Sequence, residues 1–334
     1  MEQHVSKQIM VSGLKPSGEI HLGNYLGAVK QWVELQDMHP SYFFVADLHA
    51  ITEPQKPKDL HAQIIETAAT YLALGIDPKK SVFFIQSHVP QHTELMWILN
   101  TITSMGDLER MVVYKEKISE GKEALAGLFA YPVLMAADII LYKAAHVPVG
   151  EDQRQHVELT RELARRFNTR FGNVFPLPKP LLPKVGARIM SLQDPSKKMS
   201  KSHGAATYIG LFDAPDVIRK KIKSAVTDSG SEIIYSPEKK PAVANLMTLY
   251  HLYSGLTFSE IEKEFAGKGY GDFKVALAEL LISNLSPIQD ERAAILADKN
   301  RLLTVLRDGG ERASATAAKT LDEVYAKVGL KIEI

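Results

Sequence analysis

Two short segments carry residues that could bind the phosphates of a nucleotide. The first runs from Gly13-Leu14-Lys15-Pro16-Ser17-Gly18 to His21-Leu22-Gly23-Asn24. Its small residues let backbone N–H groups approach an anion, and the side chains of His21 and Asn24 can donate hydrogen bonds to phosphate or ribose oxygens. A glycine-rich turn with a surface histidine is the plainer alternative, because a His-x-Gly-Asn pattern is weak on its own.

The second segment is the run Lys198-Met199-Ser200-Lys201-Ser202. Two lysines three positions apart, with hydroxyl groups beside them, can wrap a triphosphate as a mobile clamp. This pattern is specific, since uniform residue frequencies would produce it on the order of once in 10⁴ chains of this length. A basic, solvated loop is the alternative interpretation.

A third candidate is a carboxylate in an apolar setting. Asp138 lies among alanine, isoleucine and leucine residues at positions 136–141, so it needs a polar partner if it is buried. Capping of the following segment, or pairing with Lys143 or His146, would be a structural answer to that need.

An α/β framework is expected to position these residues. The first half of the sequence alternates β-rich runs with helical periods, over residues 9–11, 26–35, 42–46, 60–74 and 82–85. Gly75 is expected to end the second helix. The pattern continues with a helix over residues 131–142, a strand over 147–149 and a helix over 153–167. Such alternation predicts an α/β fold with a Rossmann-type, doubly wound parallel sheet, whose ligands bind at the carboxyl ends of its strands.

After residue 192 the β pattern fades. Helices are expected over residues 217–226, 242–253, 258–265, 274–284 and 291–305. We therefore expect a Rossmann-type catalytic domain over residues 1–194, a mobile phosphate-clamp loop over 195–205 and a smaller helical domain over 206–334. The last helices of that domain could pack back on the catalytic domain.

The composition excludes several classes of protein. The chain has 334 residues, of which 45% are hydrophobic and 24% charged, as in a globular protein with one large core and a smaller second unit. It has no cysteine, which excludes thiolate chemistry, and no signal pattern or membrane-length apolar run, so we expect a cytoplasmic protein without a membrane segment. A formal net charge of +1 argues against a general nucleic-acid coat. Any RNA contact would be local, at basic runs over residues 161–170 and 219–223 that are otherwise solvated helix faces.

The order and separation of the two phosphate-binding segments resemble the class I aminoacyl-tRNA synthetases, in which such segments act together on ATP. Within that class, further segments resemble the bacterial tryptophanyl-tRNA synthetases: Gly150-Glu151-Asp152-Gln153, Tyr131-Pro132-Val133-Leu134-Met135-Ala136-Ala137-Asp138-Ile139 and Ala187-Arg188-Ile189-Met190-Ser191-Leu192. The resemblance runs from about residue 11 onward. Two departures are Lys15, where many bacterial relatives have glutamine, and His203-Gly204, where an aspartate often follows the clamp.

The resemblance implies a homodimeric enzyme that uses ATP with Mg²⁺ to activate L-tryptophan and transfers it to tRNA(Trp), with no metal held by the protein itself. The helical domain would bind the anticodon. Catalytic roles would fall to His21, Asn24, Lys117, Lys198 and Lys201. The ATP-binding residues would be Lys15, Pro16, Ser17, Gly23, Asn24, Gly150, Glu151, Asp152, Ile189, Lys198, Met199, Ser200, Lys201 and Ser202.

The resemblance also implies a tryptophan site in which Asp138 accepts a hydrogen bond from the indole N–H. Apolar walls for the ring would come from Tyr131, Met135, Val147 and Val149, each of which would serve equally well as plain core. His49 and Gln153 would bind the ammonium or carboxylate end of the amino acid.

Three alternatives stay open. Tyrosyl-tRNA synthetases share the architecture and would also use an acidic residue near the ring, although Met135 and the Ala136-Ala137-Asp138 spacing argue against them. Small-molecule adenylyltransferases have a similar first motif but lack the lysine clamp. A non-catalytic synthetase paralogue is the third, and the intact His21, Lys198 and Lys201 count against it.

Overall fold

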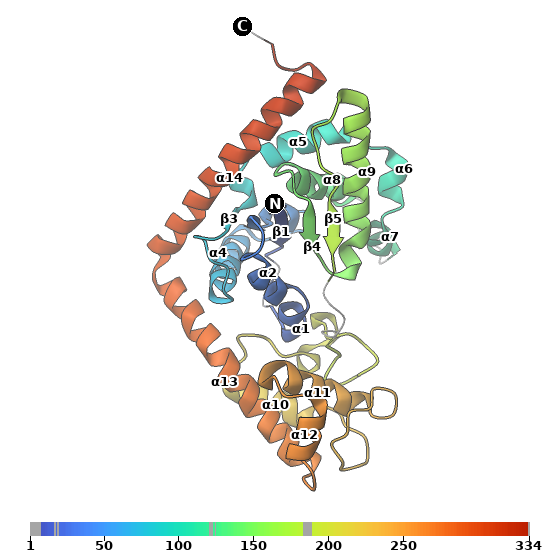
Figure 1. Cartoon of the computed structure of the whole chain (residues 1–334), viewed down its shortest axis with the longest axis vertical. Helices are drawn as coiled ribbons and strands as arrows, with labels where there is room; N and C mark the ends of the chain where they lie inside the picture. Colours follow the sequence, from blue (N-terminus) through green and yellow to red (C-terminus); the bar gives the residue numbers. More distant parts are fainter. Residues whose placement is uncertain are drawn as a thin grey trace, which may run out of the picture. The chain divides into compact units, whose positions relative to one another are not determined.

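The computed structural model (Figure 1) describes residues 8–16, 18, 20–119, 123, 125–182 and 189–332. The chain forms two compact units: unit 1 comprises Met1–Gly18, Gln31–Pro183 and Ile295–Ile334, and unit 2 comprises Glu19–Lys30 and Lys184–Ala294. Each unit therefore combines segments that are distant in the sequence. Among the described residues, no helix has both the length and the apolar character needed to cross a membrane.

Unit 1 is built on a five-stranded parallel sheet with the strand order β3-β2-β1-β4-β5. The strands are β1 (Met10–Leu14), β2 (Ser41–Val45), β3 (Val82–Ile85), β4 (His146–Pro148) and β5 (Lys179–Leu181). The chain builds outward from β1 to β3 on one side and then restarts at β4 on the other. This doubly wound order confirms the predicted fold class and places its switch point between β1 and β4.

The helices of unit 1 cover a sheet whose central strands are almost wholly buried. Phe43, Phe83 and Phe84 have no solvent exposure, as expected of parallel strands covered on both faces. Helix α8, the most apolar, packs against α5, α9 and β1. The helices are α2 (Lys30–Leu35), α3 (Asp47–Ala50), α4 (Pro57–Ala73), α5 (Gln91–Asn100), α6 (Met105–Glu109), α7 (Val112–Ser119), α8 (Ala126–Ile140), α9 (Arg154–Phe171) and α14 (Lys299–Val328).

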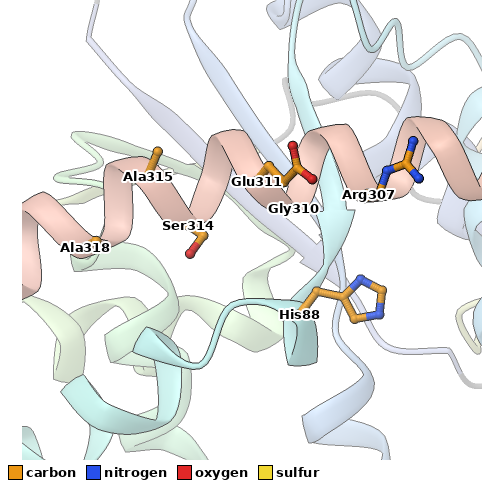
Figure 2. Close-up of a pocket in the computed structure, with 7 residues that line it drawn as sticks. All are labelled: His88, Arg307, Gly310, Glu311, Ser314, Ala315 and Ala318. Carbon is orange, nitrogen blue, oxygen red and sulfur yellow. The ribbon is translucent and has the colours of Figure 1, made fainter.

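The outer strand β3 is covered by α14, the long red helix of Figure 1. A Cβ atom at Gly309 would collide with the carbonyl oxygen of Phe83, so glycine at this position lets the helix backbone lie directly on the strand. The neighbouring Gly310 faces His88 across a shallow groove of about 440 Å³ (Figure 2). The edge of the sheet is thus closed by a segment more than 200 residues away in the sequence.

Unit 2 is mainly helical within the residues that the structure describes. It contains α1 (Leu22–Asn24), a π-helical turn (Tyr25–Val29), α10 (Pro215–Ser224), α11 (Pro241–Ser254), α12 (Phe258–Glu264) and most of α13 (Tyr270–Ala297). The helices predicted over residues 217–226, 242–253 and 258–265 are confirmed with shifts of a few residues.

The joint expected between residues 284 and 291 is wrong. Helix α13 continues through Pro287 to Ala297, and the break comes at Asp298, whose side chain caps α14 by accepting a hydrogen bond of 3.1 Å from the N–H of Arg301. The hydroxyl of Ser286 donates to the carbonyl of Ile282 at 2.8 Å, beside the hydrogen bond that the proline removes. The proline is therefore tolerated inside the helix, and an aspartate cap marks the true boundary.

Candidate functional site

His21 and Asn24 hold each other in place at the start of α1. Nδ1 of His21 accepts a hydrogen bond of 3.3 Å from the N–H of Asn24, and Oδ1 of Asn24 accepts one of 3.4 Å from the N–H of His21. This reciprocal capping fixes both side chains. Because Nδ1 is an acceptor, a neutral His21 ring carries its proton on Nε2, which leaves that N–H as a donor for a ligand.

The lysine-rich segment begins in a tight hairpin. The N–H of Ser191 donates to the carbonyl of Lys197 at 2.8 Å, and the N–H of Met199 donates to the carbonyl of Ile189 at 3.0 Å. Ile189 and Met199 are buried, whereas Lys198 and Lys201 are exposed. We call residues 198–202 the clamp loop; its lysines reach solvent from a backbone fixed by the hairpin.

Within unit 2, the structure brings the His21–Asn24 part of the first phosphate-binding segment next to the clamp loop. A Cβ atom at Gly23 would lie 3.1 Å from the ring of His21 and 3.5 Å from Cβ of Met199. Burial lowers the pKa of His21 to about 4, and the charges of Lys201 and Lys198 contribute to that shift. At neutral pH the ring is therefore an uncharged donor beside two cations, an arrangement that favours a polyanion such as a triphosphate.

In unit 1, the remaining nucleotide-binding candidates follow the two strands that flank the switch point. Lys15 and Pro16 follow β1, and Gly150 follows β4. The hydroxyl of Ser12 on β1 donates to the carbonyl of Pro148 on β4 at 3.1 Å, which ties the two strands near these ends. Parallel sheets of this kind bind ligands there.

The side chains after β4 are largely engaged with one another. Glu151 accepts a hydrogen bond of 2.9 Å from Arg154, and Nε2 of Gln153 donates to Asp152 at 2.9 Å. A Cβ atom at Gly150 would lie only 2.5 Å from Oδ1 of Asp152, so glycine leaves room for this carboxylate. Lys15 is paired with Glu53 at 3.5 Å.

Asp138, on α8, is the centre of a buried cluster of polar side chains from several elements. It is 2% exposed and accepts three hydrogen bonds: 2.6 Å from Nδ1 of His92, 2.8 Å from Nε2 of Gln86 and 2.8 Å from Nε2 of His49. The alternative pairing with Lys143 or His146 is therefore wrong. Lys143 binds Glu323 instead, and His146 packs against His39.

These bonds keep the buried carboxylate ionised. Burial by itself raises the pKa of Asp138, but the hydrogen bonds from His49 and His92 outweigh it and lower the pKa to about 2. Oδ1 accepts two of the three bonds and Oδ2 accepts one. A carboxylate offers about four acceptor positions. Among the described residues, one position on Oδ2 is thus left for a further donor.

Among the predicted tryptophan-site residues, His49 belongs to this cluster and Tyr131 lies beside it. The ring of Tyr131 meets the ring of His49 edge to face, with centroids 6.1 Å apart. The hydroxyl of Tyr131 lies 2.8 Å from Nε2 of His156, and burial, followed by the charge of His49, lowers the pKa of His156 to about 4. His156 is therefore neutral at physiological pH and can accept a hydrogen bond from the tyrosine hydroxyl.

The other predicted residues are less distinctive. Val147 is buried, and Met135 and Val149 are partly buried against the same core. Ser17 and the side chains of Lys117 and Ser202 lie outside the described residues. Among the described residues, no group of three or more histidine, cysteine or acidic side chains could hold a metal ion.

Sequence reasoning missed four members of the buried cluster: Gln86, His92, Tyr142 and His156. Gln86 directly follows a predicted strand, so its place at a carboxyl end was a usable signal. The others had no such signal: His92 meets Asp138 only through tertiary packing, and Tyr142, although four positions after Asp138, is joined to it through His92. His92 bridges the two, with Nε2 at 2.7 Å from the hydroxyl of Tyr142.

The basic runs expected to contact RNA are mostly engaged within the protein. Arg166 binds Asp107 and Glu162, and Arg219 binds Asp216 and Glu279. Arg161 donates to backbone carbonyls, and Lys221 pairs with Asp213 at 2.7 Å. Much of their charge is thus neutralised inside the protein.

Comparison with known proteins gives consistent matches over nearly the whole chain. The family described as "tRNA synthetases class I (W and Y)" matches residues 4–286. A tryptophan–tRNA ligase of Caldanaerobacter subterraneus subsp. tengcongensis is 54% identical over 321 residues, which cover 96% of this chain and 97% of that protein. The tryptophanyl-tRNA synthetase of Mycoplasma pneumoniae superposes with a TM-score of 0.87 at 36% identity, covering 97% of this chain and 98% of that one. That of Campylobacter jejuni, complexed with ADP and tryptophan, gives 0.86 at 38% identity, covering 96% and 100%.

Proposed function

The chain belongs to the class I tRNA synthetases of the tryptophan and tyrosine group, and we propose how its residues carry out ATP-dependent activation of L-tryptophan and its transfer to tRNA(Trp). The observation that carries the choice of amino acid is the 54% identity with a tryptophan–tRNA ligase over almost the entire chain. A tyrosine-specific enzyme is not favoured, since the relatives at about 50% identity are tryptophan ligases.

The buried carboxylate of Asp138 would recognise the indole. Its Oδ2 atom has room for one more donor, and an ionised acceptor at that position suits the single N–H of an indole ring. Tyr131, Met135, Val147 and Val149 would contact the ring, while His49 and Gln153 would bind the amino-acid end. An analogue without the N–H would leave the carboxylate position unpaired.

The unit 2 group would bind the triphosphate. His21 and Asn24 would donate to phosphate oxygens from one side, with Lys198 and Lys201 as the cations and Lys117 as a further candidate. Gly23, Ile189, Met199, Ser200 and Ser202 would shape the same site. The further ATP-binding candidates are Lys15, Pro16, Ser17, Gly150, Glu151 and Asp152. Mg²⁺ would enter with ATP, bridging its phosphates.

The chemistry needs no general base, because the tryptophan carboxylate is already ionised. One carboxylate oxygen forms a bond to the α-phosphorus, the bond from that phosphorus to the bridging oxygen breaks, and pyrophosphate leaves with the electron pair. The rate then depends on positioning and on stabilising the charge of the leaving group, which are the roles proposed for the neutral His21 and the two lysines. A terminal ribose hydroxyl of tRNA next attacks the acyl carbon and displaces AMP.

We also propose a homodimer. Trp97, Met105 and Val112 belong to consecutive helices of unit 1, and their side chains are 72%, 64% and 52% exposed. Large apolar side chains exposed within one stretch of chain favour a protein partner, and a second copy of the chain is the partner we propose.

The test of the function is ATP–pyrophosphate exchange by the purified protein, with tryptophan, tyrosine and phenylalanine offered in turn and no tRNA present. Exchange with tryptophan alone is expected. Exchange with tyrosine would keep the reaction and move the partner of Asp138 to a phenol. If folded protein exchanges with none of the three, the activity is absent and a binding paralogue is the better description.

A further inference from the structure

The buried side-chain amide of Asn245 on α11 hydrogen-bonds to the hairpin that leads into the clamp loop. Asn245 is 6% exposed. Its Oδ1 accepts a hydrogen bond of 2.9 Å from the N–H of Met190, and its Nδ2 donates one of 3.0 Å to the carbonyl of the same residue. Burying an asparagine costs free energy unless its polar atoms are paired. Here both atoms are paired, with the backbone N–H and carbonyl of the same residue.

Met190 is the residue directly opposite Lys198. The two form an antiparallel bridge, flanked by the hydrogen bonds from Ser191 to Lys197 and from Met199 to Ile189. Met190 therefore occupies a non-hydrogen-bonded position of the hairpin, with its own N–H and carbonyl directed away from the lysine strand. The side chain of Asn245 satisfies those two groups, as a neighbouring strand would. It therefore fixes the position of Met190 and, through the bridge, that of Lys198.

A second contact holds the other end of the clamp loop. The hydroxyl of Thr207 lies 3.0 Å from the carbonyl of Ser200 and 2.7 Å from that of Gly204. The N–H of Leu192 donates to the carbonyl of Thr207 at 3.0 Å, which returns the chain to the hairpin. The backbone of the loop is thus fixed on both sides, while Lys198 and Lys201 remain exposed.

We propose that Asn245 is a positioning residue for the reaction: it holds the hairpin so that Lys198 and Lys201 meet the leaving pyrophosphate in a fixed geometry. This rests on the function proposed for the clamp loop. Since stabilisation of developing charge depends on preorganised donors, loss of the anchor is expected to lower the rate of adenylate formation more than the binding of tryptophan.

Two variants test the proposal. Asn245→Ala removes both hydrogen bonds, and Asn245→Asp keeps the shape and the acceptor but loses the donor. Thr248→Val is the matched control, since among the described residues the hydroxyl of Thr248 binds only the carbonyl of Ala244 in its own helix, at 2.7 Å. The measurements are kcat and KM in ATP–pyrophosphate exchange, tryptophan affinity by calorimetry, and the rate of limited tryptic cleavage after Lys198 and Lys201.

Both Asn245 variants are expected to lose on the order of tenfold to a hundredfold in kcat, with unchanged tryptophan affinity and faster cleavage of the loop. Thr248→Val should behave as the unmodified protein. Wild-type kcat and cleavage rate in both variants would overturn the proposal, and so would equal losses of tryptophan affinity and kcat, which indicate general damage to the fold. If the unmodified protein shows no exchange, the proposed function fails, and the cleavage rates still decide whether Asn245 anchors the loop.

Discussion

Nδ1 of His92 lies 2.6 Å from Oδ1 of Asp138, and neither side chain is appreciably exposed. The other ring nitrogen of His92 faces the hydroxyl of Tyr142 at 2.7 Å. The ring of His92 can satisfy both contacts by donating a hydrogen bond from Nδ1 and accepting one from the tyrosine hydroxyl at Nε2. The carboxylate of Asp138 is therefore oriented by a buried hydrogen-bond network that runs through His92 to Tyr142, which leaves the carboxylate preorganised for a ligand.

Asp138→Asn should lower the selectivity for tryptophan over phenylalanine. The amide keeps the shape of the side chain but loses the charge, and sites built to bond a substrate N–H gain up to about 10⁴-fold over analogues that lack it. We expect the ratio of kcat/KM for tryptophan to kcat/KM for phenylalanine, measured by pyrophosphate exchange, to fall by up to about that factor. The exposed Asp322, which pairs with Lys331 at 2.7 Å, supplies the control variant Asp322→Ala. The same ratio in Asp138→Asn as in wild type would refute the role of this carboxylate.

Lys201→Ala should slow adenylate formation by at least about 10²-fold, the scale for losing one group that stabilises transition-state charge. Tryptophan affinity should not change. Lys197→Ala is the matched control, because Lys197 belongs to the same hairpin but pairs with Asp194 at 3.3 Å. Single-turnover kinetics separate the chemical step from product release. Equal rates for Lys201→Ala and wild type would remove Lys201 from the mechanism.

Stability should fall as the pH drops from 6.5 to about 4. The pKa values of His21 and His156 are lowered from 6.5 to about 4, so the folded state keeps both rings neutral while the unfolded state takes up protons in this window. Their contribution is therefore complete above pH 6.5 and is lost as the pH falls to about 4. The loss from Asp138, whose pKa is about 2, comes only below pH 3.8.

Urea denaturation at a series of pH values measures this effect. His156→Gln should flatten the dependence by at most about 1.4 kcal/mol per pH unit, the contribution of one proton. A slope identical to that of wild type would show that His156 is not held neutral by the fold.

Gly309→Ala should destabilise the protein by at least about 2 kcal/mol, because the added methyl group meets the backbone of β3 and the helix must shift. Gly310→Ala is the matched control. Its Cβ would lie 3.6 Å from Cβ of His88, an ordinary contact, and alanine is the better helix former by up to about 1 kcal/mol. Thermal unfolding should thus move in opposite directions for the two variants, and a similar loss in both would contradict the close approach at Gly309.

Trp97→Glu should convert the proposed dimer into a monomer. A charged side chain at the most exposed large aromatic residue of α5 would have to be desolvated in an interface. Sedimentation velocity over a range of concentrations measures the change. Val275→Glu on α13 is the control, because Val275 is 64% exposed and belongs to unit 2. A monomeric wild-type protein, or a dimeric Trp97 variant, would reject this surface.

The sequence predicted the elements with strong local signals. The strands over residues 9–11, 42–46 and 82–85 and the helix ended by Gly75 have direct counterparts in β1, β2, β3 and α4, because alternation, apolar runs and a glycine with positive φ are local features. Strand β5 has no counterpart in the prediction. It is three residues long and contains Pro180, so only its pairing with β4 identifies it.

The two phosphate-binding motifs were visible in the sequence for the same local reason, but only the family resemblance, and no local pattern, implied that they act together. Gly23 and Met199 are 176 positions apart and meet only in the folded chain. The partners of Asp138 show this limit most clearly. Sequence spacing suggested Lys143 or His146, whereas the structure supplies three partners from 46 to 89 positions away.

The packing of α14 on β3 has a consequence during synthesis of the chain. Helix α14 is synthesised more than 200 residues after β3, so this edge of the sheet stays uncovered until the helix has been made. Unpaired strand edges are where nascent and partly folded chains associate with one another. The growing polypeptide therefore exposes a strand edge that favours association with other chains until α14 has been made and packs on β3.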